Sequence, residues 1–375
     1  MKLNKKFFPV YQPMLDNNER VLVQNCLKEN WISSKGKYIE KFEKSFSNKF
    51  GYKFSTSVSN GTVALHLALL ALGIKKGDEV IIPSMTFVAV ANAVTYVGAK
   101  PIFADINLDN WTINPNDIYK KITKKTKALI CVHIYGASCD LKKINKILKR
   151  KKIFLIEDCA EAIGSKYNNK YVGNFGDIST FSFYGNKTIT TGEGGMVVTQ
   201  NKKIDERVKL LKGQGLNKKN LYDYYNHIVI GYNYRMTNIC AAIGLAQLKK
   251  IDQILKMKEK IFLRYKKNLK EVPVKFQEQI RIKKNFNSNW LISILCNTKK
   301  TRNNLINFLS KNKIETRTLF IPMHKLDIYK SKVKLINTEH IFDKGISLPS
   351  YPNLTLKDVD KICRVIKLFF KSLNK

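Results

Sequence analysis

The sequence lacks any long apolar run, and this absence limits the kinds of protein it can encode. No uninterrupted apolar stretch is long enough to span a bilayer, so we expect no membrane partner. The first residues, MKLNKKFFPVYQP, are basic but contain neither a sustained apolar segment nor a small-residue cleavage site. We therefore expect no signal peptide and a cytoplasmic location. The 375 residues are enough for a large core and two lobes.

Closely spaced cysteines are also lacking. The seven cysteines are scattered along the chain, at Cys26, Cys131, Cys139, Cys159, Cys240, Cys296 and Cys363. No two of them have the spacing of a metal site or of a redox motif. We therefore expect reduced thiols and no bound metal.

Acidic residues are few, with 29 Asp and Glu against 67 Lys and Arg, which gives a net charge of +38. A positive field of this size could attract nucleic acid, an anionic surface or phosphorylated small molecules. The alternative is that lysine replaces other polar residues everywhere in the chain. The lysines are dispersed, and runs such as KKTK and KRKK fall near the ends of expected elements. We favour this alternative and expect no nucleic-acid partner.

Apolar runs alternate with helical patterns between about residues 50 and 200. The pattern predicts strands at 78–84, 100–106, 127–136, 152–158, 178–183 and 194–200. It predicts helices at 62–72, 87–97 and 140–150. Apolar strands separated by helices are typical of an α/β fold with a mostly parallel sheet covered on both faces.

The pattern changes near residue 237. A long amphipathic helix is expected over 237–269, capped by Thr237 or Asn238, and it should leave the larger lobe. Strands are expected at 274–280, 289–296 and 313–320, and helices at 301–312 and 355–373. This predicts a large α/β domain over 1–245 and a smaller α+β domain over 246–375.

Three short stretches carry possible chemistry. SNGT at 59–62 opens a helix, whose free N–H groups suit a phosphate, although such turns are often plain helix caps. The strand FLIED ends in Asp158, whose carboxylate could pair with a cationic ring nitrogen or cap the next helix. In FSFYGNKTITTGEGG, Lys187 lies among aromatic residues and glycines, which favours a neutral, nucleophilic amine. Together the three stretches offer the groups that pyridoxal phosphate requires: a helix start for its phosphate, a carboxylate for its ring nitrogen and an amine for a Schiff base.

Longer motifs add a resemblance. WISSKGKYIEKFE, VSNGTVALHLAL, VHIYG, IEDCAEAIG, NKTITTGEGGM, GYNYRMTN and SLPSYPNLT extend it nearly from end to end. On these motifs the chain resembles the DegT/DnrJ/EryC1/StrS family of pyridoxal-phosphate sugar aminotransferases. The resemblance implies the aspartate aminotransferase-like transferase fold (fold type I), with seven strands in the large sheet. It also implies a homodimer with composite active sites.

The resemblance assigns roles to matching residues. Lys187 would bind the cofactor as a Schiff base and then move the substrate proton, Asp158 would hold the ring nitrogen, and Glu161 would lie near the ring or the substrate. The remaining cofactor contacts would be Gly61, Thr62 and Ser182 at the phosphate, Phe87 on the ring face, and Asn233 from the partner subunit. Substrate contacts would be Tyr184, Arg235 and His324, where packing is an equal alternative for the histidine.

The implied reaction takes an amino group from L-glutamate, with pyridoxamine 5′-phosphate as the intermediate form of the cofactor. The acceptor would be C4 of a nucleotide-linked 4-keto-6-deoxyhexose, first of all GDP-4-keto-6-deoxy-D-mannose, which would become GDP-perosamine for a surface polysaccharide. UDP- or dTDP-4-keto-6-deoxyglucose is the alternative. A dehydratase resembles the chain too, but that branch has histidine at the position of Lys187. A nucleic-acid-binding regulator is the rival from another class, and no helix-turn-helix or zinc pattern supports it.

Overall fold

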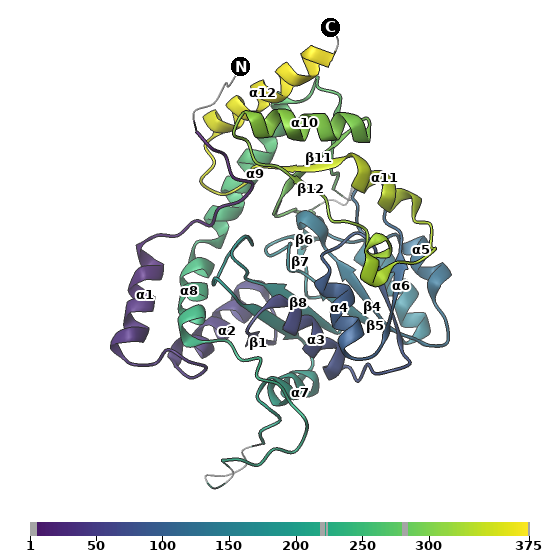
Figure 1. Cartoon of the computed structure of the whole chain (residues 1–375). Coiled ribbons are helices and arrows are strands. Elements are labelled where there is room, and N and C mark those ends of the chain that lie inside the picture. The colour runs from purple at the N-terminus through teal and green to yellow at the C-terminus, as the bar shows by residue number, and fades with distance from the viewer. Residues whose placement is uncertain (1–5, 218–221, 223, 280–283, 374–375) are drawn as a thin grey trace.

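The computed structural model describes residues 6–217, 222, 224–279 and 284–373. In this part of the chain a seven-stranded sheet forms the centre of the larger lobe (Figure 1). The spatial order is β1 (Phe54–Val58), β9 (Gly195–Thr199), β8 (Ile178–Ser182), β5 (Phe154–Asp158), β4 (Thr126–Val132), β2 (Glu79–Pro83) and β3 (Lys100–Ala104). Strand β9 is antiparallel to both of its neighbours, and the other pairs are parallel.

Helices cover both faces of this sheet, because successive strand residues are apolar on both sides. In β2, Val80 and Ile82 enter one core cluster and Ile81 enters the other. The first face is covered by α3 (Gly61–Ala71), α4 (Ala89–Tyr96) and α7 (Lys202–Lys212). The second face is covered by α2 (Lys37–Phe50), α5 (Pro115–Lys121), α6 (Leu141–Lys151) and α8 (Asn238–Lys249), with α1 (Asn17–Lys28) outside α8. The sequence-predicted layering is therefore present.

Strand β1 is one element that the apolar pattern did not predict. Its sequence, FSTSV, is mostly polar, yet four of its five residues are buried. The hydroxyl of Thr56 donates to Asp205 at 2.7 Å, and the hydroxyl of Ser57 donates to Glu43 at 2.7 Å. These hydrogen bonds offset the cost of burying polar groups. Helices α1 and α2 were not predicted either.

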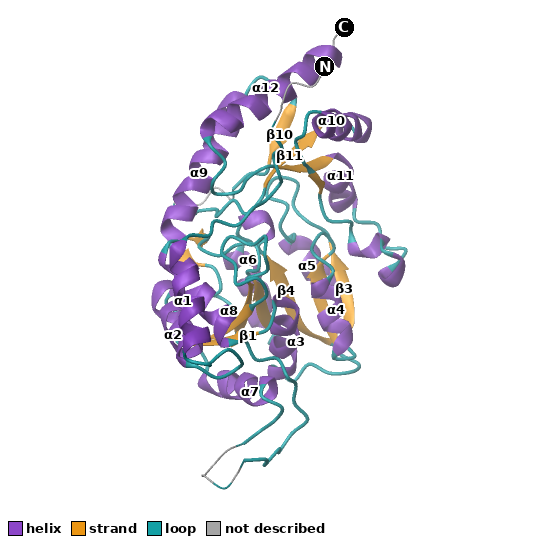
Figure 2. Ribbon diagram, turned by 60° about the vertical axis from the view of Figure 1, so that its left-hand side comes forward, coloured by secondary structure: helices purple, strands orange, loops and turns teal. Residues whose placement is uncertain are grey.

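The long helix expected over 237–269 is divided. Thr237 is the cap, since its hydroxyl accepts the N–H of Cys240. Helix α8 ends at Lys249, and α9 (Ile251–Asn268) begins directly after Lys250. The Lys250 ammonium lies 2.7 Å from Glu19 on α1, so an ion pair fixes the chain at this break. Helix α9 then runs from the larger lobe to the smaller lobe (Figure 2).

The smaller lobe contains an antiparallel sheet flanked by helices. The strand order is β10 (Val274–Phe276), β11 (Ile292–Cys296), β13 (Gly345–Leu348) and β12 (Arg317–Thr318). The helices of this part are α10 (Lys299–Lys311), α11 (Ile336–Lys344) and α12 (Leu356–Leu373). Strand β13 and helix α11 were not predicted. The strand expected over 274–280 ends at Phe276, since the described residues 277–279 are not in a strand, and residue 280 lies outside the described residues.

The N-terminal segment belongs structurally to this smaller lobe. Phe8 pairs with Ile314 and enters the core cluster of the lobe. The division into domains at residues 245 and 246 stays a prediction. Short elements complete the described structure: β6 (Lys166–Tyr167), β7 (Lys170–Tyr171) and the 3₁₀ turns η1 (Ile134–Gly136), η2 (Met323–Lys325) and η3 (Asp327–Tyr329). Among the described residues, no helix combines the length and apolar character needed to cross a membrane.

Candidate active site

A cavity of about 590 Å³ lies where the parallel strands of the large sheet end. Asp158 is the last residue of β5, Ser182 is the last residue of β8, and Asn60 follows β1. Ligands of open α/β sheets bind at this edge, and the cavity has the size of a cofactor or small-ligand pocket. Most of the residues predicted from sequence line it, namely Gly61, Thr62, Phe87, Asp158, Glu161, Ser182, Tyr184 and Lys187.

Lys187 lies in the loop between β8 and β9, with its backbone N–H bonded to the Tyr184 carbonyl at 2.9 Å. Its side chain is 13% exposed, and Nζ lies 3.7 Å from Oε1 of Glu161. The ring centroid of Trp290 is 3.9 Å from the same nitrogen. Burial lowers the pKa of Lys187, although the nearby carboxylates of Glu161 and Asp158 oppose the shift. A lowered pKa makes the free amine more available as a nucleophile and base.

The two carboxylates respond to burial in the opposite direction. Burial raises the pKa of Asp158. Two interactions oppose this shift by stabilising the charged carboxylate: the Ala160 N–H, which donates to Oδ1 at 3.0 Å, and the positive charge of Lys187. Burial also raises the pKa of Glu161 to about 7, while Lys187 and the Tyr135 N–H, at 2.8 Å, act against the shift. A site with one amine and two perturbed carboxylates is suited to proton transfer.

The start of α3 forms a cradle for an anion. The Asn60 side chain caps the helix by accepting the Val63 N–H at 3.0 Å. A Cβ atom added at Gly61 would lie 2.7 Å from Cβ of Ser182, so the two segments approach too closely for any side chain at Gly61. Gly61, Thr62 and Ser182 all line this end of the cavity. The first N–H groups of a helix lack partners within the helix and can bind an anion. A phosphate fits this arrangement.

Two aromatic residues predicted from sequence lie at the open side. Phe87 is 53% exposed and Tyr184 is 51% exposed, and both line the cavity. Exposed aromatic rings at a cavity offer flat surfaces for stacking on a ligand ring. With the phosphate cradle, the buried Asp158 and the amine of Lys187, the residues present fit pyridoxal phosphate.

Three of the predicted residues do not line the cavity of their own chain. Asn233 and Arg235 are exposed, and the Arg235 guanidinium donates to the Asn233 side chain at 3.2 Å. His324 is buried, with Nδ1 2.7 Å from the Ser84 hydroxyl and Nε2 3.2 Å from Glu339. The structure therefore places His324 in a packed hydrogen-bond network of one subunit.

Sequence reasoning missed part of the lining. Tyr135, Trp290, Arg317 and Phe320 also line the cavity. The Tyr135 ring stacks on Trp290 and on Phe320, with ring centroids 6.1 and 5.5 Å apart. Tyr135 has a φ of 54°, a left-handed conformation that is uncommon for a tyrosine. The motif VHIYG contained a signal for Tyr135, whereas Trp290, Arg317 and Phe320 come from the smaller lobe and had none.

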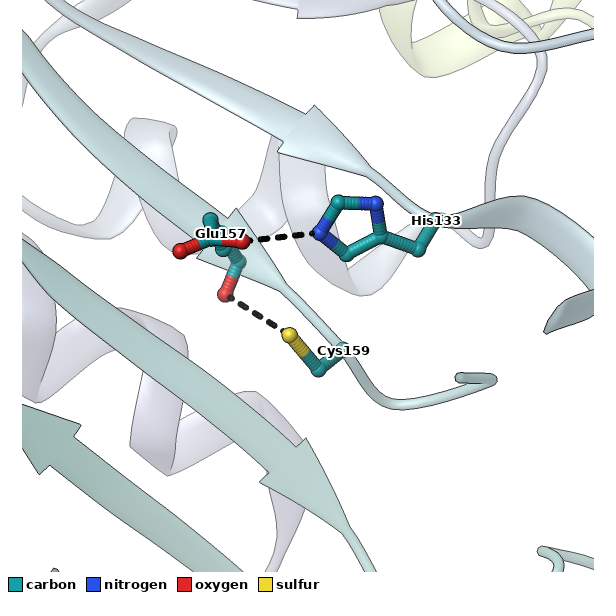
Figure 3. Close-up of side chains that lie close together, drawn as sticks. All are labelled: His133, Glu157 and Cys159. Carbon is teal, nitrogen blue, oxygen red and sulfur yellow. Dashed lines mark hydrogen bonds and ion pairs between the residues drawn. The ribbon is translucent and has the colours of Figure 1, made fainter. Parts of the chain in front are cut away.

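A buried polar cluster includes both sequence neighbours of Asp158, together with His133 (Figure 3). His133, Glu157 and Cys159 place possible metal-ligand atoms within 4.8 Å of one another. Both ring nitrogens of His133 already form hydrogen bonds within the protein, since Nδ1 accepts the Cys139 N–H and Nε2 donates to Glu157 at 3.1 Å. The other oxygen of Glu157 accepts the N–H groups of Phe175 and Gly176, both at 2.7 Å. Hydrogen bonds thus account for this cluster, and the absence of a bound metal stays a prediction.

Solved structures of other proteins share this fold. A solved Helicobacter pylori structure, described as PseC, an aminotransferase involved in pseudoaminic acid biosynthesis, superposes with a TM-score of 0.91 at 30% identity, covering 98% of this chain and 100% of that one. The PLP-form of the putative sugar aminotransferase Spr1654 of Streptococcus pneumoniae has a TM-score of 0.92 at 25% identity, covering 98% and 100%. These likenesses confirm the predicted fold class. The fold and its buried lysine define an enzyme of the aminotransferase class.

Sequence comparison gives the family. Residues 13–367 match the DegT/DnrJ/EryC1/StrS aminotransferase family, and the chain belongs to it. The GDP-perosamine synthase of Escherichia coli O157:H7 is 51% identical over 366 residues, which cover 97% of this chain and 99% of that protein. The predicted family and the predicted class of enzyme are thereby confirmed, and the regulator is no longer a rival.

Proposed function

We propose that the chain transfers an amino group from L-glutamate to C4 of GDP-4-keto-6-deoxy-D-mannose, giving GDP-perosamine and 2-oxoglutarate. The observation that carries this proposal is the 51% identity to a GDP-perosamine synthase across 97% of the chain. The aminotransferase family and the buried amine of Lys187 support the type of reaction.

The cofactor of the proposed reaction is pyridoxal 5′-phosphate. Gly61, Thr62 and Ser182 would hold its phosphate at the start of α3, and Asp158 would face its ring nitrogen. Phe87 would cover one face of the ring. When bound, the cofactor supplies an electron sink and carries the amino group between the two substrates. A cationic ring nitrogen would stabilise the charged form of Asp158 and oppose the effect of burial on its pKa.

Lys187 would move protons at the reacting carbon, assisted by Glu161. The lowered pKa of Lys187 allows its Nζ to take a proton from the donor carbon and return one to C4 of the sugar. Glu161, 3.7 Å away, stabilises the charged form of the amine after each proton uptake. Histidine at this position accompanies dehydration in the related branch, so Lys187 favours amino transfer over loss of a hydroxyl.

Substrate binding would involve both lobes. Tyr184 and Arg317 line the cavity from opposite lobes. A guanidinium such as that of Arg317 suits a diphosphate or a carboxylate, the anionic groups of the two proposed substrates. Binding between two lobes would also exclude water from the reacting atoms.

A homodimer with composite sites is part of the proposal. Asn233 and Arg235 are exposed in the single chain and do not line its cavity. The described parts of the segment between α7 and α8 project from the body of the molecule, as Figures 1 and 2 show. Tyr225 and Ile230 in this segment are 88% and 89% exposed. A partner subunit would cover these side chains and receive Asn233 at its cofactor phosphate.

A cytoplasmic location also remains a proposal. The seven cysteines are free, and six of them are buried. Free thiols are typical of a reducing compartment.

One experiment tests the substrate. The purified enzyme is loaded with pyridoxal phosphate, treated with L-glutamate, freed of glutamate, and then given GDP-, UDP- or dTDP-linked 4-keto-6-deoxyhexose in separate reactions. We expect the GDP sugar alone to restore the initial cofactor absorbance. Restoration by the UDP or dTDP sugar instead would favour the viosamine-type product. No change with glutamate would contradict amino transfer altogether.

A further inference from the structure

Two side chains from distant parts of the sequence bind consecutive carbonyls in the loop that carries Lys187. The Tyr11 hydroxyl donates to the Lys187 carbonyl at 2.8 Å. The indole Nε1 of Trp290 donates to the Asn186 carbonyl at 2.6 Å. Trp290 belongs to the smaller lobe, and Tyr11 belongs to the N-terminal segment that pairs with this lobe. The sequence predicted no contact of either residue with this loop.

Tyr11 is itself firmly anchored. The neighbouring Val10 donates its N–H to Glu315 at 2.9 Å and accepts the N–H of Ser350 at 3.0 Å. The Tyr11 ring packs against the cores of both lobes, and the ammonium of the fully buried Lys258 lies 5.1 Å from its centroid. The hydroxyl therefore has little freedom to leave the Lys187 carbonyl.

Trp290 is anchored in a comparable way. Its side chain is buried, and its ring lies at 13° to that of Tyr135, with centroids 6.1 Å apart. The same ring lies 3.9 Å from Nζ of Lys187. Trp290 thus contacts the lysine-bearing loop twice, once at a carbonyl and once at the amine.

We propose that Tyr11 and Trp290 are positioning residues, which fix the backbone at Asn186 and Lys187 so that Nζ faces Glu161. This inference rests on the proposed role of Lys187. The lysine side chain has several rotatable bonds, so its amine stays in place only if the backbone is held and the walls are packed. A partly buried carbonyl is stabilised by a donor, and a side-chain donor supplies one without admitting water next to the amine.

Tyr265 offers a matched control, because it makes the same kind of bond elsewhere. It is fully buried, and its hydroxyl donates to the Pro349 carbonyl at 3.0 Å in the smaller lobe. Tyr11→Phe and Tyr265→Phe therefore each remove one hydroxyl from one backbone carbonyl. Only the first carbonyl belongs to Lys187.

The test compares these two variants in the full-length chain. In protein freed of cofactor, the pKa of the Lys187 amine is measured from the pH dependence of its reductive methylation, followed by peptide mass spectrometry. We expect Tyr11→Phe to raise this pKa by about one unit, because a loosened loop lets water reach the amine and relieves the effect of burial. With the cofactor bound, kcat should fall about tenfold while the KM values for both substrates stay nearly unchanged. Tyr265→Phe should leave the Lys187 pKa and kcat as in the wild type.

A second measurement asks whether the two donors act together. If both donors fix the same loop, the double variant Tyr11→Phe/Trp290→Phe should shift the Lys187 pKa by less than the sum of the shifts in the two single variants. The proposal is overturned if Tyr11→Phe leaves the Lys187 pKa unchanged, or if Tyr265→Phe shifts it equally. Failure of the proposed function would look different, since borohydride reduction of the wild-type enzyme would then attach the cofactor to another lysine or to none.

Discussion

The amine of Lys187 lies 3.7 Å from the carboxylate of Glu161, and both side chains are largely buried. Burial disfavours the charge on each of them, whereas their mutual attraction favours both charges. A small change in the surroundings of the pair is therefore enough to move a proton between the two groups. Such a pair is suited to a reaction in which a proton must leave one carbon and reach another.

The raised pKa of Glu161 has a consequence for stability. The carboxyl binds a proton up to a pH of about 7 in the folded chain but only up to about 4.5 when unfolded. Its contribution to the free energy of unfolding is thus fully present below about pH 4.5 and is lost as the pH rises to about 7. The total loss is up to about 3 kcal/mol. Glu161→Gln should remove this loss.

Urea unfolding of cofactor-free protein between pH 4.5 and 8 checks this expectation. The stability of Glu161→Gln relative to the wild type should increase with pH across the window. Glu206→Gln, at an exposed ion pair with Lys202, is the control and should give no such trend. Parallel curves for the wild type and Glu161→Gln would contradict the environment assigned to Glu161.

Lys187→Ala should abolish the link between protein and cofactor while leaving the phosphate cradle intact. We expect turnover to fall by at least about 10³-fold, because nucleophile and base are lost together. Borohydride reduction followed by intact-mass measurement should no longer attach the cofactor, although equilibrium binding should persist. Lys166→Ala, on the short strand β6, serves as a control for loss of a lysine. Near-normal turnover of Lys187→Ala would rule out the assignment.

The phosphate cradle at Gly61 can be tested by adding a side chain that blocks the close approach of Gly61 to Ser182. The added methyl group of Gly61→Ala would lie 2.7 Å from Cβ of Ser182, so the start of α3 must shift and cofactor affinity should fall about tenfold or more. Equilibrium dialysis with pyridoxal phosphate measures the affinity. In a Ser182→Gly background the same alanine should cost much less, because the blocking carbon is gone. An equal cost in both backgrounds would show that the close approach is not the cause.

Composite sites predict complementation between two inactive variants. A mixed dimer of Lys187→Ala and Asn233→Ala subunits would contain one site with both lesions and one intact site. After subunits are mixed in equal amounts and allowed to exchange, activity should recover to about a quarter of the wild-type level. Gel filtration confirms the assembly state. If activity stays at the sum of the two parents, Asn233 acts within its own subunit or not at the cofactor.

The sequence predicted local chemistry well and long-range contacts poorly, for a physical reason. Asp158 ends a strand, Gly61 begins a helix and Lys187 lies in the loop between β8 and β9, so a short motif around each residue was enough to suggest its chemistry. The contacts of Lys187 with Tyr11 and of Asn186 with Trp290 join residues 176 and 104 positions apart, and no local pattern records them. Strand β1 was missed for a similar reason, since its polar side chains find partners only in the folded core.

Lys258 provides a last test, because it is a fully buried lysine remote from any carboxylate partner that the described structure shows. Its ammonium donates to the Ser350 carbonyl beside Tyr11. Burial lowers its pKa to about 7, against 10.5 for an ordinary lysine. Between these pH values the unfolded chain binds a proton that the folded chain releases. Stability from this group is therefore present at high pH and is lost as the pH falls toward 7.

Lys258→Met keeps most of the side-chain volume and removes the titration. Between pH 7 and 9, the free energy of unfolding of the wild type should rise relative to the variant by up to about 3 kcal/mol. Urea unfolding of the cofactor-free chain measures the difference, and Lys260→Met, at an exposed position of the same helix, is the control. A difference that stays constant with pH would mean that Lys258 remains charged in the folded state. The carbonyl of Ser350 and the ring of Tyr11 would then compensate fully for its burial, and the N-terminal segment would be held by a charge rather than by a neutral amine.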